Sequence, residues 1–551
     1  MPAHDVTNQP PPLVDYNVFR GDRALADVLA REGVSGTFQT LETLGALAGS
    51  AQAQTWARMA NEYPPQLLTH DRFGHRIDEV EYHPDYHQLM AVATRFGLHA
   101  TPWVHDEPLA HTARAAKFYV WGQVEAGHGC PISMTYAAIP TLRVQPQSAR
   151  LWEPRLANTA YDPELHPISE KTSALCGMAM TEKQGGSDVR ANRTRAVFAE
   201  HTAEGDAYLL TGHKWFCSAP MSDAFLILAQ AQSGLTCFLM PRVLQDGTRN
   251  RIFIQRLKDK LGNRSNASSE IELEDAWALR IGEEGRGVQT IVEMVNFTRL
   301  DCINGSAALM RGASAQAIHH ATYRHTFGKA LIDQPLMQNV LADLALESEA
   351  AMTLLVRLAR AVDRAAADPH EALVKRLGTA VGKYYVCKRA PTVVGEALEC
   401  LGGNGYVEES GMPRLYREAP LNSIWEGSGN INALDVLRIL NKQPETLDAY
   451  RAEIEPALGD VRMRAAANEM FAIARDAGGE AQARMLVERM AVLWQAALLA
   501  RDALSPSVEP FIDSRIAGRW GRSLGTLASS SGHAAVIDRA RPVQSVEYSK
   551  G

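Results

Sequence analysis

The sequence predicts an α+β protein in four parts: an N-terminal helical domain, a middle antiparallel β-barrel, a C-terminal four-helix bundle and an extra C-terminal helical domain. Apolar residues recur every three or four positions up to about residue 175 and again from Gly287, as in amphipathic helices. Between these regions the apolar period is two, which predicts short strands. A length of 551 residues also exceeds one ordinary core, so several packed units are expected.

The changes of period set the expected domain boundaries. An extended N-terminal arm is expected at 1–23, because its NQPPPL tract is rich in proline. This arm has no basic region followed by an apolar run, so it does not look like a signal peptide. The remaining expected segments are a helical domain at 24–175, a β domain at 176–286, a bundle at 287–443 and an extra helical domain at 444–551.

Short alternating strings predict the strands of the β domain. RAVFAE, the turn AEGD and AYLLTGHKWFC predict a strand, a turn and a second strand. Further strings of this kind are DAFLILAQA, LTCFLMPR, RIFIQRL and SEIELEDAW. Their even spacing predicts a small barrel or sandwich between two helical regions.

The segments after the β domain predict a helical bundle followed by a helical tail. Long helices of a four-helix bundle are expected at 288–323, 335–367, 371–401 and 428–441. Glycines break the third of these after its last turn. In the tail, helices are expected at 461–475 and 480–501.

Composition limits the classes of function. The formal net charge is -7, so contact with nucleic acid would need a local basic patch. Seven cysteines without a C-x-x-C pair argue against a disulfide framework and a structural zinc site, and they predict a reducing cytoplasm. No stretch is long and apolar enough to predict a membrane span. His83 and His87 stand four apart, but Pro84 between them favours surface histidines, and no metal site is expected.

Two stretches carry candidate chemistry. In NSIWEGSGNIN at 422–432, Glu426 lies between an aromatic residue and a run of small residues, so a ligand could come close and Glu426 is a candidate base. On spacing alone, an acidic residue in a Gly-rich turn is more often just a turn residue. In MTEKQGGSDV at 180–189, adjacent glycines before Ser187 predict either a plain turn or a loop that cups an anion such as a pyrophosphate. This loop is not a G-x-G-x-x-G sequence, so a Rossmann site is excluded.

Seven strings, in order, resemble the motifs of the acyl-CoA dehydrogenase family. MTEKQGGSDV resembles the family's MTEPGAGSDV, and GHKWFCS, KDKLGNRSNAS and GEEGRG resemble its following strand and turn motifs. RHTFGKALIDQPLMQ, LGGNGY and IWEGSGNI resemble its bundle motifs, with Ala330 where the first has Pro. The resemblance implies the same helix, β, helix architecture and implies FAD as the cofactor.

The resemblance also implies roles for individual residues. Glu426 would be the catalytic base that removes the α-proton of an acyl thioester while a hydride passes to the flavin. Arg299 follows Thr298, which occupies the position of the base in some members. Arg299 would therefore adjust the charge of the site, although an ion pair within the bundle is an equally simple account.

A larger set is implied to hold the flavin. Its members are Met180, Thr181, Gly186, Ser187, Trp215, Phe216, Cys217, Ser218, Arg324, Phe327, Gln338, Trp425, Gly427, Ser428 and Asn430. Cys217 stands where the family has a flavin-bonding Thr or Ser, so either Ser218 takes over this bond or the flavin is tuned differently. Arg324, Phe327 and Gln338 match positions that reach the FAD of a neighbouring subunit, which implies an oligomer, usually a tetramer.

The NQPPPL arm, the long tail and the strings RLKDKLGNRSNAS, RLYRE and NSIWEGSGNI resemble the AidB branch of this family. This branch comprises flavoproteins of the bacterial adaptive response to DNA alkylation. The resemblance implies a homotetramer whose extra helical domain binds double-stranded DNA. Because DNA phosphates attract cationic side chains, the candidate contacts are Arg438, Arg515, Arg519 and Arg522. Arginines on a solvated helix face are the ordinary alternative.

Two functions follow from these observations. In the first, a DNA-bound flavoprotein protects DNA or inactivates alkylating agents and has weak acyl-CoA dehydrogenase activity, similar to that of isovaleryl-CoA dehydrogenases. In the second, a genuine acyl-CoA dehydrogenase acts on a short branched or unusual acyl chain, and its tail serves only oligomerisation. The late arginines of the tail favour the first function, whereas the intact base at Glu426 favours the second.

Overall fold

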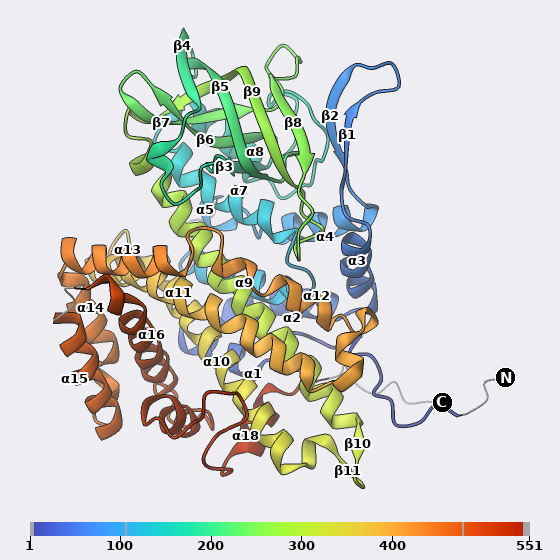
Figure 1. The fold of residues 1–551 in the computed structure, drawn as a ribbon, viewed down its shortest axis with the longest axis vertical. Coiled ribbons are helices and arrows are strands. Elements are labelled where there is room, and N and C mark those ends of the chain that lie inside the picture. Colours follow the sequence, from blue (N-terminus) through green and yellow to red (C-terminus); the bar gives the residue numbers. More distant parts are fainter. Residues whose placement is uncertain (1–4, 105–106, 476–478, 544–551) are drawn as a thin grey trace. The chain divides into compact units, whose positions relative to one another are not determined.

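The computed structural model describes residues 5–104, 107–475 and 479–543, which form two compact units (Figure 1). The first unit contains the described residues within 1–54, 111–124 and 302–551. The second contains those within 55–110 and 125–301. The expected helical domain at 24–175 thus contributes to both units, and the five expected segments stay a prediction.

A seven-stranded sheet forms the centre of the second unit. Its strands are β3 (Cys176–Ala179), β4 (Arg195–Thr202), β5 (Gly205–Ser218), β6 (Ala224–Ala231), β7 (Gly234–Pro241), β8 (Ile252–Leu257) and β9 (Ser268–Ile281). They follow the order β3-β6-β4-β5-β9-β7, β8 pairs with β9, and an additional β6–β7 pairing closes the sheet into the predicted barrel. Most pairs are antiparallel, but β6 pairs in parallel with both β3 and β4. In each parallel pair the two strands are separated by other strands along the chain, so no hairpin turn forces them to run in opposite directions.

Side chains that point inward from the strands form the core of the barrel. Phe225 and Ile227 of β6 pack in one hydrophobic core with Phe238 of β7 and Ile271 of β9. Each of these side chains is at most 1% exposed. The start of β8 alternates between buried and half-buried positions, whereas β6 and β7 are buried on both faces over most of their length.

Helices and a hairpin complete the second unit. The hairpin of β1 (Gln66–His70) and β2 (Arg76–Glu81) was not predicted from the sequence. Its turn depends on Gly74, which has φ +87°, and on Asp71, whose carboxylate accepts hydrogen bonds from the amides of Phe73 and His75. The helices are α4 (Pro84–Arg95), α5 (Thr101–Val104), α7 (Gly129–Leu142) and α8 (Pro146–Leu156).

Long helices dominate the first unit and confirm the predicted bundle. They are α9 (Gly287–Tyr323), which also extends into the second unit, α10 (Pro335–Arg364), α11 (Pro369–Glu399) and α13 (Gly429–Lys442). The side chain of Asp368 caps the first turn of α11 by accepting a hydrogen bond from the amide of His370. The shorter helices are α1 (Arg23–Arg31), α2 (Phe38–Ala48), α6 (Ala110–Gly122) and α12 (Met412–Glu418), while α3 (Ala51–Glu62) begins in this unit and continues into the second.

The tail packs against the bundle instead of extending from it (Figure 1). Its helices are α14 (Glu445–Ile454), α15 (Val461–Arg475), α16 (Ala483–Leu499), α17 (Val508–Phe511) and α18 (His533–Ala540), so the expected helices at 461–475 and 480–501 are present. The guanidinium of Arg357 in α10 lies 2.8 Å from carboxylate oxygens of both Glu371 and Glu453. At the far end of the tail, Arg539 of α18 pairs with Asp27 of α1 at 2.5 Å.

The described part of the arm, residues 5–23, is held by hydrogen bonds to the bundle. The side chain of Asn8 donates to the carbonyl of His325 and accepts from its amide, each at 2.8 Å. The carbonyl of Pro11 lies 2.8 Å from Nε2 of His319. Among the described residues, no helix is both long and apolar enough for a membrane crossing.

Candidate active site

Glu426 lies in a turn of the first unit, immediately before α13, and its backbone is in the left-handed region. Its φ is +56°, and the φ of the following Gly427 is +95°. A left-handed conformation costs a non-glycine residue about 1–3 kcal/mol, so the surrounding structure must hold it. The strain is therefore stored at the residue that the sequence identified as the candidate base.

Lys383 of α11 holds this turn, and sequence reasoning missed it. Its ammonium donates hydrogen bonds to the carbonyls of Asn422, Trp425 and Gly427 at 2.6, 2.7 and 2.8 Å. Two of these carbonyls belong to the residues on either side of Glu426, and Lys383 itself is 1% exposed. The available sequence signal is its place in a stripe of small and apolar residues, where a lysine is buried only with partners.

Side-chain amides fix the rest of the turn. Asn432 donates to the carbonyls of Gly427 and Ser428 at 2.6 and 3.0 Å. The indole N–H of Trp425 donates to the side chain of Asn422 at 2.9 Å. Ser428 and Asn430 are exposed at the start of α13, while Trp425 and Gly427 are half-buried. The structure thus gathers this group of predicted residues on one rigid turn.

The MTEKQGGSDV loop begins at the end of β3 in the second unit, next to Trp215. The amide of Trp215 donates to the carbonyl of Thr181 at 2.8 Å, and Asn192 donates to the carbonyl of Met180 at 2.9 Å. Gly186 and Ser187 are exposed further along the loop. A Cβ atom at Gly186 would lie 2.5 Å from Oγ1 of Thr181, so the loop can pass this hydroxyl closely only with glycine there.

A buried ion pair, also missed from the sequence, anchors this loop. Oε1 of Glu182 lies 2.9 Å from the ammonium of Lys214, and both side chains are fully buried. Burial on its own raises the pKa of Glu182, but the attraction of Lys214 and several hydrogen bonds lower it to about 2. Burial lowers the pKa of Lys214 to about 8 despite its partner. Both groups are therefore charged at neutral pH, and the amides of Arg193 and Thr194 also donate to the carboxylate.

The strand that carries Trp215 also carries an exposed ring, and an ammonium from the residue after β8 lies over both rings. The ammonium of Lys258 lies 3.7 Å from the ring centre of Trp215 and 4.5 Å from that of Phe216. Phe216 is 49% exposed, which is unusual for a phenyl ring. Cys217 is buried in the barrel core, and burial raises the pKa of its thiol to about 12, so the thiol is neutral. Ser218 is half-buried at the end of the same strand.

The residues predicted to reach a neighbouring subunit lie around the small hairpin of β10 (His325–Thr326) and β11 (Lys329–Ala330). Phe327 at its tip is 99% exposed and has φ +50°. Arg324 donates to the carbonyl of Asn8 at 2.6 Å, and Gln338 is half-buried in the first turns of α10. Arg299 is 9% exposed in α9, and its predicted electrostatic role stays a prediction.

Arg515 does not fit its predicted contact with DNA phosphates. Its side chain is 2% exposed and lies on a short π-helical turn, where its guanidinium pairs with Asp343 and, at 2.8 Å, with Glu347. A guanidinium satisfied by two buried carboxylates cannot reach a phosphate at the surface, so this prediction is wrong. Arg438 and Arg519 keep side chains that are 60% and 63% exposed, each beside one aspartate, and Arg522 is exposed.

The histidines considered as metal ligands have other roles. His83 caps α4 by accepting a hydrogen bond from the amide of Asp85, and Nδ1 of His87 lies 2.8 Å from the hydroxyl of Tyr161. Within 5–104, 107–475 and 479–543, no cluster of three or more His, Cys, Asp or Glu side chains is arranged to hold a metal ion.

Family models and individual relatives match most of this chain. Residues 8–163 match the N-terminal domain of the adaptive response protein AidB, 177–276 the acyl-CoA dehydrogenase middle domain and 285–440 the C-terminal domain of that family. The AidB protein of Escherichia coli strain K12 is 50% identical over 448 residues, which cover 81% of this chain and 82% of that protein. Acyl-CoA dehydrogenase family member 11 of Caenorhabditis elegans is 33% identical over 75% of this chain and 68% of its own length.

Among solved structures, Caenorhabditis elegans ACDH-11 in complex with C11-CoA matches with a TM-score of 0.83 at 27% identity. The match covers 98% of this chain and 93% of that chain. It therefore spans the tail as well as the bundle and the barrel, and the whole architecture has a solved counterpart.

Proposed function

The chain belongs to the AidB branch of the acyl-CoA dehydrogenase family, and from this premise we propose that Glu426 is its catalytic base. The protein is an FAD-dependent enzyme of this family, and bound FAD supplies the hydride acceptor. The carboxylate of Glu426 removes the α-proton of an acyl-CoA thioester. The observation that carries this proposal is the strained turn at Glu426, which Lys383 holds on both sides through backbone carbonyls.

The residues of the second unit fit the cofactor. At Gly186 the backbone of the loop lies so close to Thr181 that a side chain at this position would collide with it. Ser187 offers an exposed hydroxyl for a pyrophosphate, and Trp215 offers an aromatic face for a flat ring system. The ammonium of Lys258 near that face supplies positive charge for an anionic ligand. These residues would hold FAD together with Met180, Phe216 and Ser218, and neutral Cys217 adds no charge.

An acyl-CoA thioester is the proposed substrate. The solved Caenorhabditis elegans relative carries C11-CoA, which supports this class of ligand here. A short branched chain such as isovaleryl is the first to test. Glu426→Gln should retain FAD and its yellow colour but should no longer bleach the flavin anaerobically with isovaleryl-CoA. Bleaching at the unaltered rate in this variant would remove Glu426 from the role of base.

We also propose that the protein assembles as a homotetramer. A phenyl ring that is 99% exposed on a backbone with positive φ is costly in an isolated chain, and Phe327 combines both properties. A second copy covering this hairpin would remove the exposed apolar surface. Sedimentation of Phe327→Ala against the unaltered protein tests this assembly, and an unchanged tetramer would move the contact elsewhere.

We further propose that this protein binds double-stranded DNA and protects it from alkylation, or inactivates alkylating agents. Exposed Arg438, Arg519 and Arg522 support phosphate contact, and the AidB-type N-terminal domain supports a place in the adaptive response. None of the seven cysteines, all of which lie in the described parts of the chain, forms a disulfide, which supports a cytoplasmic location.

Titration of the purified protein into a labelled duplex, followed by fluorescence anisotropy at two salt concentrations, tests DNA binding. Affinity that falls steeply with salt is expected. No binding at low salt would leave acyl-CoA dehydrogenation as the function and the tail as a support for assembly. The burial of Arg515 against the bundle favours that second candidate, because it gives the tail a structural role.

A further inference from the structure

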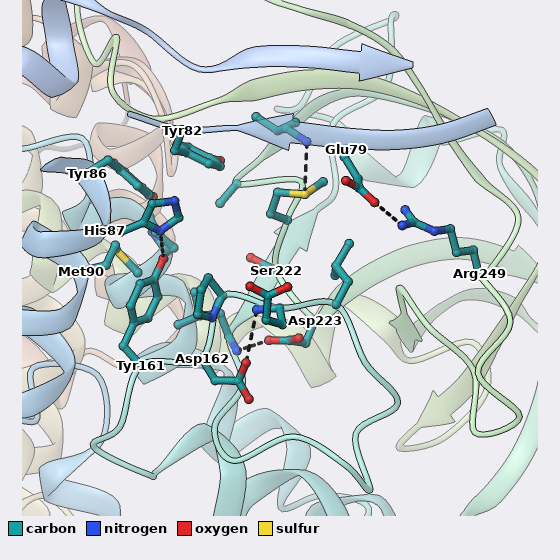
Figure 2. A pocket seen from close by; sticks show the side chains of 18 residues that line it. Glu79, Tyr82, Tyr86, His87, Met90, Tyr161, Asp162, Ser222, Asp223 and Arg249 are labelled. Carbon is teal, nitrogen blue, oxygen red and sulfur yellow. Dashed lines mark hydrogen bonds and ion pairs between the residues drawn. The ribbon is translucent and has the colours of Figure 1, made fainter. Parts of the chain in front are cut away.

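The second unit contains a cavity of about 210 Å³ that is separate from the residues assigned to FAD and to the base. Its lining comes from β2, α4 and the loops at 161–165 and 219–223 (Figure 2). The family motifs identified in the sequence account for none of these loops. The cavity therefore needs its own explanation.

One side of the cavity is aromatic. The rings of Tyr82 and Tyr86 stack with their centres 4.3 Å apart and their planes 16° from parallel. The hydroxyl of Tyr161 is engaged with Nδ1 of His87 at 2.8 Å, and Met90 lies beside them in the lining (Figure 2). Burial lowers the pKa of His87, so this wall presents neutral aromatic surface at physiological pH.

The charged groups around the cavity are not balanced. Glu79, Asp162, Glu164 and Asp223 line it, whereas Arg249 is the cation among the lining residues and pairs with Glu79. Lys171 is buried and lies 3.0 Å from Asp162 and 3.2 Å from Asp223, so one ammonium serves two carboxylates. Four carboxylates thus meet two paired cations, and the charge of buried Arg242 also acts on Glu79.

The most buried of these four carboxylates is that of Asp223. This side chain is 7% exposed, and burial raises its pKa to about 6 in spite of Lys171. Its Oδ2 accepts one hydrogen bond from the amide of Leu175 at 2.7 Å. A carboxylate oxygen has room for a further donor, and a second cation in the cavity would stabilise its charged form.

An unpaired hydroxyl lies next to this carboxylate. Ser222 is 1% exposed, and within the described parts of the chain its Oγ has no hydrogen-bond partner. A buried polar group without a partner destabilises the fold, so such groups normally have one. Ser222 and Asp223 lie together at the centre of the lining in Figure 2, opposite the tyrosines.

We propose that this cavity binds a small aromatic ammonium ion, with the ring against Tyr82 and Tyr86 and the N–H groups donating to Asp223 and Ser222. Size supports this class, since an engineered apolar cavity of about 150 Å³ in another protein holds benzene, which leaves space here for a one-carbon ammonium arm. Charge supports it as well, because the net negative lining repels anions and an organic cation can also interact with aromatic faces.

Isothermal titration of the FAD-loaded protein with benzylammonium chloride tests the proposal. Benzyl alcohol has nearly the same shape without the charge, and its binding should be at least about tenfold weaker, as expected when a charge-assisted hydrogen bond is lost. Equal binding of the two probes, or no heat from benzylammonium at all, would overturn the proposal.

Variants locate the site. Asp223→Asn should weaken benzylammonium binding about tenfold, and exposed Glu164→Gln about threefold, as expected for a buried and a surface charge. Glu164→Gln alters only an exposed side chain, so it keeps the test open if Asp223→Asn fails to fold. Glu200→Gln, on the exposed face of β4, is the matched control and should bind normally. Unaltered affinity in Glu164→Gln and in folded Asp223→Asn would place the binding elsewhere.

Flavin reduction should be unchanged in Glu164→Gln. Failure of the proposed ammonium site is therefore distinguishable from failure of the dehydrogenase proposal.

Discussion

Replacing Lys383 by methionine should misplace Glu426 while leaving the chain folded. Methionine has a similar length but donates no hydrogen bond, so three carbonyls lose the ammonium. The carbonyl of Gly427 still accepts from Asn432, but those of Asn422 and Trp425 lose their bonds to Lys383. At about 1–3 kcal/mol for each buried polar group left unpaired, the loss is roughly 2–6 kcal/mol. This loss is as large as or larger than the strain of about 1–3 kcal/mol stored at Glu426, so the turn should relax.

The kinetic consequence follows from geometry. A catalytic group displaced by about 1 Å loses on the order of 100-fold in rate. Anaerobic stopped-flow bleaching of the flavin by isovaleryl-CoA should therefore slow by about that factor in Lys383→Met. Lys442→Met, at the exposed end of α13, is the matched control and should react normally. In Lys383→Ala, added ethylammonium should restore part of the rate, because it returns a donor to the vacated space.

Hydrogen exchange of the amides at 422–428 provides a readout that needs no substrate. Protection should fall in Lys383→Met and recover in Lys383→Ala with ethylammonium. The reasoning is refuted if Lys383→Met keeps both the protection and the bleaching rate of the unaltered protein. Slower bleaching with full protection would instead mean that the charge of Lys383, and not the position of the turn, matters.

Two further predictions concern the tail. Substituting Arg438, Arg519 and Arg522 together by Ala should weaken duplex binding and flatten its salt dependence in anisotropy titrations, whereas Arg515→Ala should lower the free energy of unfolding by about 3–5 kcal/mol through its buried partners. The free energy of unfolding should depend on pH through the carboxyl of Glu347. Burial raises the pKa of this group, but Arg389 and Arg515 lower it from an ordinary 4.5 to about 2. Because the folded state holds the ionised form, about 3 kcal/mol of stability is present above pH 4.5 and is lost as the pH falls towards 2. Urea titrations across this range should show a shallower loss in Glu347→Gln, and equal slopes would contradict this assignment.

The architecture was predictable because periodicity is a local property of the chain. The barrel, the bundle and the tail helices follow from runs of residues whose spacing matches one buried face. The β1–β2 hairpin was missed because its strands are short and half-exposed, and a helical pattern surrounds it. Glu426 and Trp215 were found because each lies in a distinctive local string.

Residues whose roles depend on distant partners were not predictable in the same way. Arg515 lies among other arginines of the tail, and its burial is decided by Asp343 and Glu347, which lie far away in the sequence. Lys383 has the appearance of an ordinary helix lysine until the turn before α13 is placed against it. For such residues, tertiary packing determines whether the charge faces solvent or a buried partner.

The pairing of Arg539 with Asp27 has a consequence for biosynthesis. Helix α1 packs against α10 and α18, so one of the first helices made acquires its full set of neighbours only after residue 540 has been added. The residues of the second unit, by contrast, all precede residue 302, so its internal contacts can form on the ribosome earlier. During the interval, α1 and the long bundle helices have exposed apolar faces, which are natural targets for chaperones. Shortening the chain before α18 should therefore lower the yield of native protein more than its loss of buried surface alone would.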